Sequence, residues 1–322
     1  MFGECHMHIF MNGTNYKKAV ELHKNGVQDE DIRHKFAQYQ RSGISFVRDG
    51  GDVLGVSDRA RQFAPEYGIT YRTPVFAIHK NGHYGGIVGR GFDTMQEYHQ
   101  LVKKVRKEGG NFIKIMISGI MDFDREGEVN EIPLQEEEIR EMIHIAHEEG
   151  FSVMAHANGA RTVQCAVEAG LDSVEHGNFV DEECLQAMKE SQAVWVPTFA
   201  TIANLIGKGR FDDEGLKRLK AHQGGNIRRG FELGVKIALG SDAGAFCVPH
   251  CQGLQDEYEL MQELVGVKQR AWAQESQKKD PNDHSACAQN CVTEVPVGVP
   301  LMTKEELDIR LQAAEKEIWR KF

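Results

Sequence analysis

The chain lacks the features that mark membrane and secreted proteins. Its 322 residues contain no stretch approaching the ~20 consecutive apolar residues of a membrane span, and the N-terminus lacks the basic-then-apolar order of a signal peptide. Cysteine is sparse and odd in number, with seven residues scattered along the chain, which fits reduced thiols better than a disulfide framework. We therefore expect a cytoplasmic protein without membrane contact.

Excess positive charge is also missing. The sequence holds 38 Lys and Arg against 48 Asp and Glu, and its pI is near 5.8. Nucleic-acid and anionic-membrane surfaces both need clustered positive charge, so neither partner is expected. A small-molecule substrate is the partner that this composition favours.

What the sequence does contain is an alternation of short apolar runs and amphipathic helical segments. The apolar content of 41% is enough for a large core. After a first strand within residues 1–10 and a helix-prone region at 15–41, the expected strands are 43–50, 69–78, 111–118, 151–156, 171–176, 193–199 and 235–242. The expected helices between them are 56–67, 94–108, 135–149, 159–169, 181–191 and 213–233.

Eight strands that alternate with helices predict a closed (β/α)8 TIM barrel, in the α/β class, as a single domain over residues 1–322. An open doubly wound sheet is the alternative, but no Gly-x-Gly-x-x-Gly follows the first strand. Residues 266–300 are polar without a sustained period and predict an insertion or mobile loop. Residues 301–322 predict a C-terminal helix, opened by a capping box of Thr303 and Glu306.

Metal-ligand residue types recur at the ends of the expected strands. His6 and His8 stand two apart, so they share one face of the first strand and can coordinate the same divalent metal. His156 and His176 each close an apolar strand, and Asp242 closes the last one. Singly, each could be a hydrogen-bonded core residue or, for the aspartate, a turn former. Together they predict ligands around the C-terminal mouth of the barrel.

Lys114 lies within the strand 111–118, where the isoleucines must face the helices and leave Phe112, Lys114 and Met116 pointing into the barrel. An unpaired ammonium there costs several kcal/mol. Two interpretations remain open. Either Glu4 or Asp242 pairs with the lysine, or its neutral amine reacts with carbon dioxide to give a carbamate that bridges two metal ions.

These strand ends closely resemble the amidohydrolase superfamily over residues 1 to about 264. The run from Lys114 to residues 196–198 is most similar to the branch of Xaa-Pro dipeptidases, related carboxypeptidases and imidazolonepropionase-like proteins. The segments that carry the resemblance are Glu4-Cys-His-Met-His8, Phe112-Ile-Lys-Ile115, Met154-Ala-His-Ala-Asn158, Ser173-Val-Glu-His-Gly177 and Ile237-Ala-Leu-Gly-Ser-Asp-Ala243.

The resemblance implies a set of ligands. His6, His8 and Asp242 would hold one metal ion, His156 and His176 a second, and carboxylated Lys114 would bridge them, with zinc the expected metal. The sequence departs from the family where Glu4 replaces the usual aspartate, in the 266–300 segment, and in lacking both halves of a small β-sandwich. We expect the loss of the sandwich to be coherent rather than a truncation. Related barrels commonly form homo-oligomers, so the resemblance also implies that assembly.

The function that follows is a binuclear amidohydrolase acting on a dipeptide or an N-acyl amino acid-like substrate. A bridging hydroxide would attack the amide or peptide carbonyl, and Asp242 would carry the proton to the leaving nitrogen. Alternatives are a lactone or phosphoester hydrolase, a mononuclear deaminase on the same barrel, and a non-catalytic metal-binding barrel. By resemblance, the expected substrate-binding residues are His83, Arg90, His222 and His250.

Two further features have less specific interpretations. The acidic loop at residues 122–131 would favour cationic substrates, or it is a solvated charge run. Unpaired thiols are the simpler interpretation of the two Cys-x3-Cys pairs near a histidine, and a structural zinc is the alternative. The residues concerned are Cys247, Cys251, His284, Cys287 and Cys291.

Overall fold

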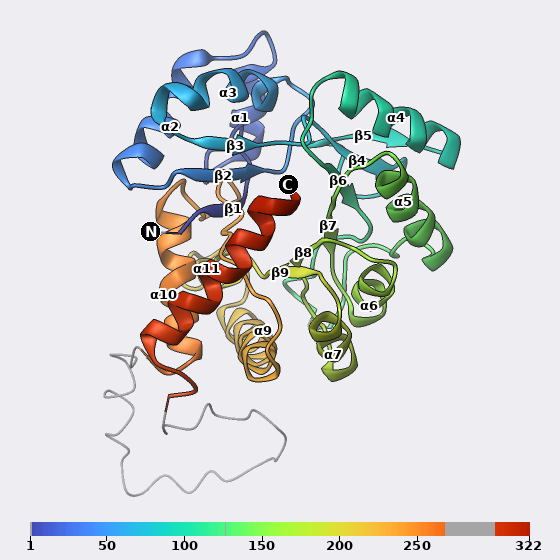
Figure 1. Ribbon diagram of the computed structural model, residues 1–322. Coiled ribbons are helices and arrows are strands. Elements are labelled where there is room, and N and C mark those ends of the chain that lie inside the picture. The colour runs from blue at the N-terminus through green and yellow to red at the C-terminus, as the bar shows by residue number, and fades with distance from the viewer. Residues whose placement is uncertain (1, 126, 268–299) are drawn as a thin grey trace, which may run out of the picture.

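A computed structural model describes residues 2–125, 127–267 and 300–322 (Figure 1). The strands are parallel and lie in the centre, surrounded by helices. They are β1 (Glu4–Met7), β2 (Phe46–Asp49), β3 (Thr70–Arg72), β4 (Ala77–Lys80), β5 (Gly89–Phe92), β6 (Ile113–Met116), β7 (Val153–Ala157), β8 (Ser173–His176) and β9 (Val194–Val196).

The helices follow the expected order. They are α1 (Tyr16–His23), α2 (Asp29–Arg41), α3 (Val56–Phe63), the 3-10 helix η1 (Ala64–Tyr67), α4 (Met95–Lys107), α5 (Glu136–Glu148), α6 (Ala160–Glu168), α7 (Glu182–Glu190), α8 (Ala200–Ala203), α9 (Asp213–Leu233), α10 (Gln252–Leu264) and α11 (Lys304–Lys321). In the part of the chain that the structure describes, no helix is long and apolar enough to cross a membrane.

The expected closed barrel is only partly formed. The named strands make a three-stranded sheet, β1-β2-β3, and a six-stranded sheet, β5-β4-β6-β7-β8-β9. The segment 235–242, expected as the eighth strand, is not a regular strand. It still contacts both neighbours, because Trp195 N–H donates to Lys236 O at 2.8 Å and Cys5 N–H donates to Leu239 O at 3.0 Å. The molecule is therefore a barrel-like parallel α/β fold without a continuous ladder.

Close packing at Gly240 explains part of this irregularity. A Cβ atom there would lie 2.5 Å from Val196 Cγ1 and 2.8 Å from His6 N, so only glycine allows this approach. Two residues later, Asp242 has φ of 59°, in the left-handed region. Regular strand geometry cannot include that backbone, and the segment instead delivers Asp242 to the end of β1.

The expected strand 69–78 is also interrupted. It forms β3 and β4 with a break at Pro74, which has no N–H to donate, and at Val75, whose φ is 68°. The loop expected at 79–91 begins inside β4 and includes most of β5, which pairs with β4. The break at Pro74 could be inferred from the sequence, whereas the pairing of β5 with β4 could not.

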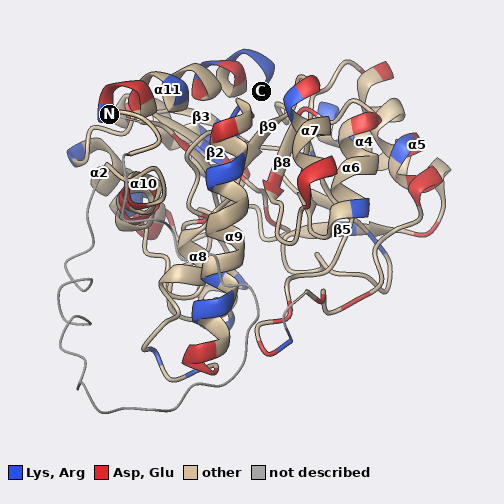
Figure 2. Ribbon diagram, turned by 90° about the horizontal axis from the view of Figure 1, so that it is seen from below, with Lys and Arg blue, Asp and Glu red and all other residues tan. Residues whose placement is uncertain are grey.

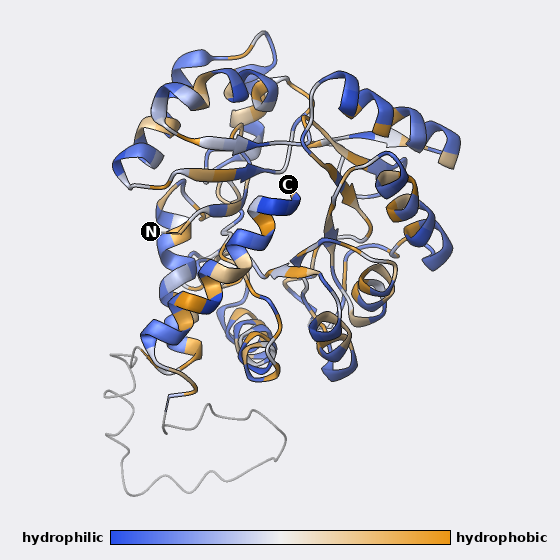
Figure 3. Ribbon diagram, viewed as in Figure 1, coloured by the Kyte–Doolittle hydropathy of each residue, from blue (hydrophilic) through white to orange (hydrophobic). Residues whose placement is uncertain are grey.

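Side-chain alternation around β6 agrees with the expectation for the isoleucines and Phe112, whereas Met116, also expected to point inward, belongs to the same cluster as the isoleucines. Ile113 and Ile115 pack into the large core between strands and helices, whereas Phe112 belongs to a smaller inner cluster. That inner cluster is closed from one end of the strands by α11, through Ala314 and Ile318. Figure 3 shows hydrophobic stretches in β6, β7 and β9 and mostly hydrophilic outer sides of the helices.

The helix expected at 301–322 is confirmed as α11, with the capping box of Thr303 and Glu306. Most of the segment expected as an insertion, 266–300, lies outside the described residues. Figure 2 shows basic and acidic residues interspersed along the outer helices, in keeping with the excess of acidic over basic residues in the sequence.

Candidate metal centre and active site

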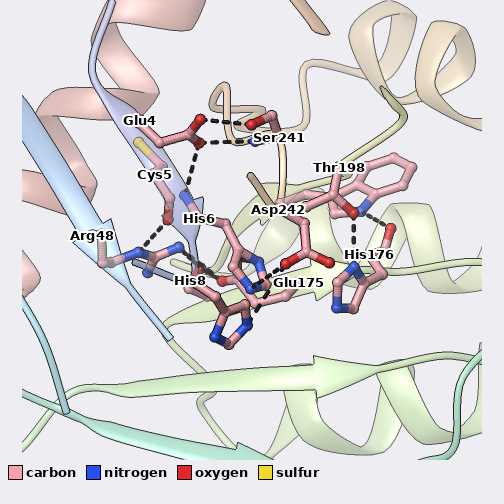
Figure 4. Close-up of polar contacts among 12 residues, drawn as sticks. Glu4, Cys5, His6, His8, Arg48, Glu175, His176, Thr198, Ser241 and Asp242 are labelled. Carbon is pink, nitrogen blue, oxygen red and sulfur yellow. Dashed lines mark hydrogen bonds and ion pairs between the residues drawn. The ribbon is translucent and has the colours of Figure 1, made fainter. Parts of the chain in front are cut away.

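The C-terminal ends of the strands bring the predicted ligands together (Figure 4). Ligand atoms of His6, His8 and Asp242 all lie within 4.8 Å of one another. The ring centroid of His176 lies 5.2 Å from that of His6 and 4.6 Å from that of His156. Five side chains from four segments of the chain therefore form one cluster.

In both His6 and His8, one ring nitrogen faces an oxygen atom of the protein and the other faces Asp242. His6 Nδ1 lies 2.8 Å from Glu175 Oε2, and its Nε2 lies 3.7 Å from Asp242 Oδ1. His8 Nδ1 lies 3.4 Å from Gly51 O, and its Nε2 lies 3.6 Å from the same Asp242 oxygen. His8 Nδ1 donates to the Gly51 carbonyl, so its Nε2 lone pair faces Asp242. His6 Nδ1 faces the Glu175 carboxylate without hydrogen-bond geometry.

The second pair has the same arrangement. His156 Nε2 lies 3.0 Å from Gly119 O, and His176 Nδ1 lies 2.7 Å from Thr198 Oγ1. Among the described residues, no hydrogen bond involves His156 Nδ1 or His176 Nε2. Fixing one imidazole nitrogen through a neighbouring acceptor is the usual way in which metal-binding histidines are oriented.

Burial keeps these histidines neutral at pH 7. Burial, with Lys114 nearby, lowers the pKa of His8 to about 4 and that of His156 to about 3. The pKa values of His6 and His176 also fall well below their ordinary value, again chiefly because of burial. Neutral imidazole is the form that binds a cation. With a carboxylate beside them, the four histidines are a donor set that suits divalent zinc.

Lys114 is 1% exposed, and its Nζ has no hydrogen-bond partner among the described residues. Burial lowers its pKa to about 8. The pairing with Glu4 that the sequence left open does not occur, because the Glu4 carboxylate accepts hydrogen bonds from Ser241 N at 2.8 Å and from Ser241 Oγ at 2.6 Å. Asp242 influences the lysine electrostatically without forming an ion pair with it.

Left-handed backbone recurs at the strand ends of the site. His176, Thr198 and Asp242 have φ values of 66°, 48° and 59°. Strand alternation would send the consecutive residues Glu175 and His176 to opposite faces. The left-handed turn instead lets both reach His6, one through its carboxylate and the other through its ring. Such backbone is costly outside glycine and concentrates at functional sites.

A model of the amidohydrolase family matches residues 2–281, which is most of the chain. The chain belongs to the amidohydrolase family. The resemblance inferred from the strand-end residues is thereby confirmed at the level of the family.

Individual relatives agree with this amidohydrolase assignment. The ochratoxinase of Aspergillus niger is 28% identical over 210 residues, which cover 62% of this chain and 39% of that protein. The chain therefore spans well under half the length of the curated relative that it matches. A protein of Mycobacterium bovis without assigned function is 27% identical over 132 residues, which cover 39% of this chain and 35% of that protein.

Solved structures show the same fold. A Xaa-Pro dipeptidase with bound methionine has a TM-score of 0.64 at 22% identity, covering 82% of this chain and 70% of that one. The A. niger ochratoxinase structure has a TM-score of 0.65 at 21% identity, covering 82% and 66%. A prolidase complexed with N-methylphosphonate-L-proline has a TM-score of 0.63 at 22% identity, covering 82% and 70%.

Arg48 and Glu175 support the amidohydrolase site, and sequence reasoning missed both. Arg48 Nη2 donates to Glu175 Oε1 at 2.8 Å, and Arg48 Nε donates to Cys5 O at 2.6 Å. Both side chains are fully buried. The other Glu175 oxygen faces His6, so the pair links β1, β2 and β8 beneath the ligands. The sequence did contain a signal for Glu175, because side-chain alternation in the segment 171–176 places it on the inward face.

The segment that holds His176 is itself anchored. The Glu257 carboxylate accepts N–H groups of Phe199 at 2.9 Å and Ala200 at 2.6 Å, next to Thr198. Trp195 Nε1 donates to His176 O at 2.9 Å. The Glu257 carboxylate, from α10, thus fixes the loop after β9, in which Thr198 contacts His176. The sequence gave no signal for this contact, because nothing local pairs residue 257 with residue 199.

Two of the expected substrate residues lie in the turn between β4 and β5 or in β5 itself. His83 is half-buried, with Nδ1 3.9 Å from Glu131 Oε1. Arg90, in β5, covers the Phe76 ring at 4.5 Å and lines a surface cavity of about 400 Å³. No predicted metal ligand lines that cavity. Substrate contact by either residue stays a prediction.

The other two expected substrate residues make contacts within the protein. His222 packs edge-on against Phe179, with ring centroids 5.8 Å apart. Both ring nitrogens of His250 are engaged, Nδ1 with Tyr39 Oη at 3.0 Å and Nε2 with Met11 O at 2.9 Å. A substrate contact by His250 would therefore need one of these hydrogen bonds to break.

The acidic loop and the cysteines have separate outcomes. Asp122 and Glu128 form ion pairs with Arg125 inside the loop, so part of its negative charge is already paired. Cys247 and Cys251 are free thiols in the described chain. The remaining residues of the expected zinc site, His284, Cys287 and Cys291, lie outside the described residues.

Proposed function

We propose that this protein is a binuclear metal-dependent hydrolase of amide or peptide bonds in small molecules. The observation that carries the proposal is the shared orientation of four buried, neutral imidazoles. Each faces an oxygen atom with one nitrogen and leaves the other for a cation, next to the half-buried carboxylate of Asp242.

His6, His8 and Asp242 would hold one ion, and His156 with His176 a second. Divalent cations bound there would lower the pKa of a bound water molecule and polarise a substrate carbonyl. Zinc fits because nitrogen and carboxylate donors suit it. The remaining steps fall to side chains of the protein.

Lys114 would bridge the ions as a carbamate. The ammonium first releases one proton, the neutral amine attacks carbon dioxide to form a C–N bond, and a second proton leaves to solvent, so a buried cation becomes an anionic oxygen ligand. Its isolation supports this assignment, because an unpaired ammonium in the barrel interior is costly and the carbamate would remove that cost. The lowered pKa of the amine makes the reactive neutral form accessible near pH 8.

Asp242 would move the proton. It would accept a proton at a carboxylate oxygen from the attacking water and donate it to the leaving nitrogen. Burial raises the pKa of Asp242 to about 7, although Lys114 opposes this. A group with a pKa near the working pH can both take up and release a proton efficiently.

Dipeptides and N-acyl amino acids are the proposed substrates. This choice rests on the names of similar proteins, which include an ochratoxinase and Xaa-Pro dipeptidases. Lactones and phosphoesters remain alternatives, because the same donor set would serve them equally.

The test is turnover by metal-replete protein on dipeptides, N-acyl amino acids, lactones and phosphoesters, together with metal content by elemental analysis. We expect about two zinc ions per chain and hydrolysis of the amide set. One ion per chain with release of ammonia would instead identify a deaminase. Bound metal without turnover of any class would identify a non-catalytic metal-binding barrel.

A further inference from the structure

Tyr84 lies directly against the metal-ligand cluster. It belongs to the turn between β4 and β5, and its ring centroid lies 4.9 Å from that of His156 at an interplanar angle of 38°. The other neighbour of His156 is His176, at 4.6 Å. The phenol is also within electrostatic range of Asp242. Tyr84 therefore belongs to the same end of the barrel as the proposed reaction.

The Tyr84 hydroxyl is not used by the described part of the protein. No hydrogen bond to it occurs among these residues, whereas Tyr98 Oη donates to Met142 O at 2.9 Å and Tyr39 Oη contacts His250 at 3.0 Å. Tyr84 is half-buried, whereas Tyr98 and Tyr39 are fully buried. A phenol packed on a ligand histidine without a hydrogen-bond partner is a donor available to a substrate.

The backbone holds Tyr84 in this place. Its N–H donates to both carboxylate oxygens of Glu131, at 2.8 and 3.0 Å. The next residue, Gly85, has φ of 129°, and a Cβ there would lie 2.8 Å from Met116 Cγ and 2.9 Å from His79 Cβ. The turn can pack this closely against the strands only with glycine, so the ring position is fixed by the fold.

The phenol also stays protonated. An unperturbed tyrosine phenol has a pKa of about 10. At physiological pH the group is therefore a hydrogen-bond donor. A donor fixed in advance is what a developing oxyanion needs, because no reorganisation is required during the reaction.

We propose that Tyr84 is a catalytic residue whose phenolic O–H donates a hydrogen bond to the carbonyl oxygen of the scissile amide. This inference rests on the proposed function, since it needs a carbonyl substrate beside the ligands. The tetrahedral intermediate carries negative charge on that oxygen, so the hydrogen bond strengthens as the reaction proceeds. Removing one such donor typically lowers kcat on the order of 10²–10³-fold.

The decisive variant is Tyr84→Phe, which keeps the ring against His156 and removes only the hydroxyl. Tyr16→Phe, at an exposed tyrosine, is the matched control. We expect Tyr84→Phe to lower kcat on the order of 10²-fold, with KM and zinc content close to wild type and with the control unchanged. A kcat within twofold of wild type, or a loss explained by lost zinc, would overturn the proposal.

Binding of N-methylphosphonate-L-proline gives a readout that does not need turnover. Its tetrahedral phosphonate resembles the intermediate, so we expect calorimetry to show at least tenfold weaker binding to zinc-loaded Tyr84→Phe than to wild type. Equal affinities would contradict the role of Tyr84. If wild type hydrolyses no amide but the affinities still differ, the reaction assignment fails while the hydroxyl contact stands.

Discussion

Glu175 Oε2 lies 2.8 Å from His6 Nδ1, and the other oxygen of the same carboxylate accepts a hydrogen bond from Arg48 at 2.8 Å. The carboxylate therefore orients a metal ligand and neutralises a buried cation. Glu175→Gln removes the charge and keeps the shape. We expect zinc affinity to fall about 10–100-fold, measured by chelator competition. Glu182→Gln, at an exposed ion pair, should leave the affinity unchanged.

The same substitution should also lower stability, because Arg48 would remain buried without a counter-charge. Breaking a buried pair typically costs about 3–5 kcal/mol. Thermal unfolding of the zinc-free protein measures this cost separately from the ligand effect. Unchanged stability together with unchanged zinc affinity would show that Glu175 neither orients His6 nor compensates the charge of Arg48.

Asp242→Asn tests the proton transfer. The amide keeps an oxygen near His6 and His8 but cannot accept a proton from water. We expect kcat to fall about 10²–10⁴-fold, while most of the zinc is retained. Elemental analysis on the protein used for kinetics separates loss of metal from loss of proton transfer. Full activity would remove Asp242 from the mechanism.

Lys114→Met tests the carbamate, and Lys35→Met is its control. Both lysines are buried, but Lys35 Nζ donates to Ile9 O at 2.7 Å and to Asp31 at 2.6 Å, whereas Lys114 has no hydrogen-bond partner in the described chain. We expect Lys35→Met to destabilise the metal-free fold and Lys114→Met to leave it unchanged or stabilise it. Bound zinc should fall from two to about one only in Lys114→Met.

A labelled-carbon experiment checks the modification directly. Wild-type protein equilibrated with ¹³C-bicarbonate should show a carbamate carbon resonance, and Lys114→Met should not. A resonance of equal intensity in both proteins would place the modification elsewhere. No resonance in zinc-replete wild type would mean that the lysine stays unmodified.

Gly240→Ala tests the close approach of the last segment to β1. The added methyl would meet Val196 Cγ1 at 2.5 Å and His6 N at 2.8 Å, so we expect a loss of about 1–3 kcal/mol in the free energy of unfolding. Gly225→Ala is the control, because its Cβ would meet nothing within 4 Å on α9. That helical position should gain up to about 1 kcal/mol. Denaturant unfolding of both variants measures the contrast.

The raised pKa of Glu257 leads us to expect that the stability of the protein depends on pH. Burial raises its pKa from 4.5 to about 8 in the folded protein, so the native state binds a proton that the unfolded state has released. Its contribution to stability is therefore full below pH 4.5 and is lost as the pH rises toward 8. Thermal unfolding should show a steeper decline over this window in wild type than in Glu257→Gln. Identical slopes would contradict the raised pKa.

The sequence was sufficient for local patterns and for grouping the strand-end residues of the candidate site. Alternation in 111–118 placed the isoleucines outward and Phe112 inward, as the structure has them, because period-two packing depends only on neighbours. The capping box at Thr303 could be predicted for the same reason. Strand-end histidines could be grouped because parallel strands end at one side.

Long-range pairings could not be predicted in this way. The contact between Arg48 and Glu175 joins residues 127 positions apart, and that of Glu257 with Phe199 joins residues 58 apart. No periodicity encodes such pairs. The irregular segment 235–242 was misjudged because a run of apolar and small residues looks like a strand. Its left-handed Asp242 appears only once β1 lies beside it.

The contacts at one nitrogen of each imidazole have a consequence for how the protein would handle the proposed metals. The side chains are ordered by carbonyl, hydroxyl and carboxylate acceptors, so much of the entropy of assembling the centre is already lost when the chain folds. Cations should then load and exchange without refolding, unlike in small zinc-dependent domains that unfold when the metal is removed. Substituting cobalt or manganese would change the chemistry while leaving the scaffold in place.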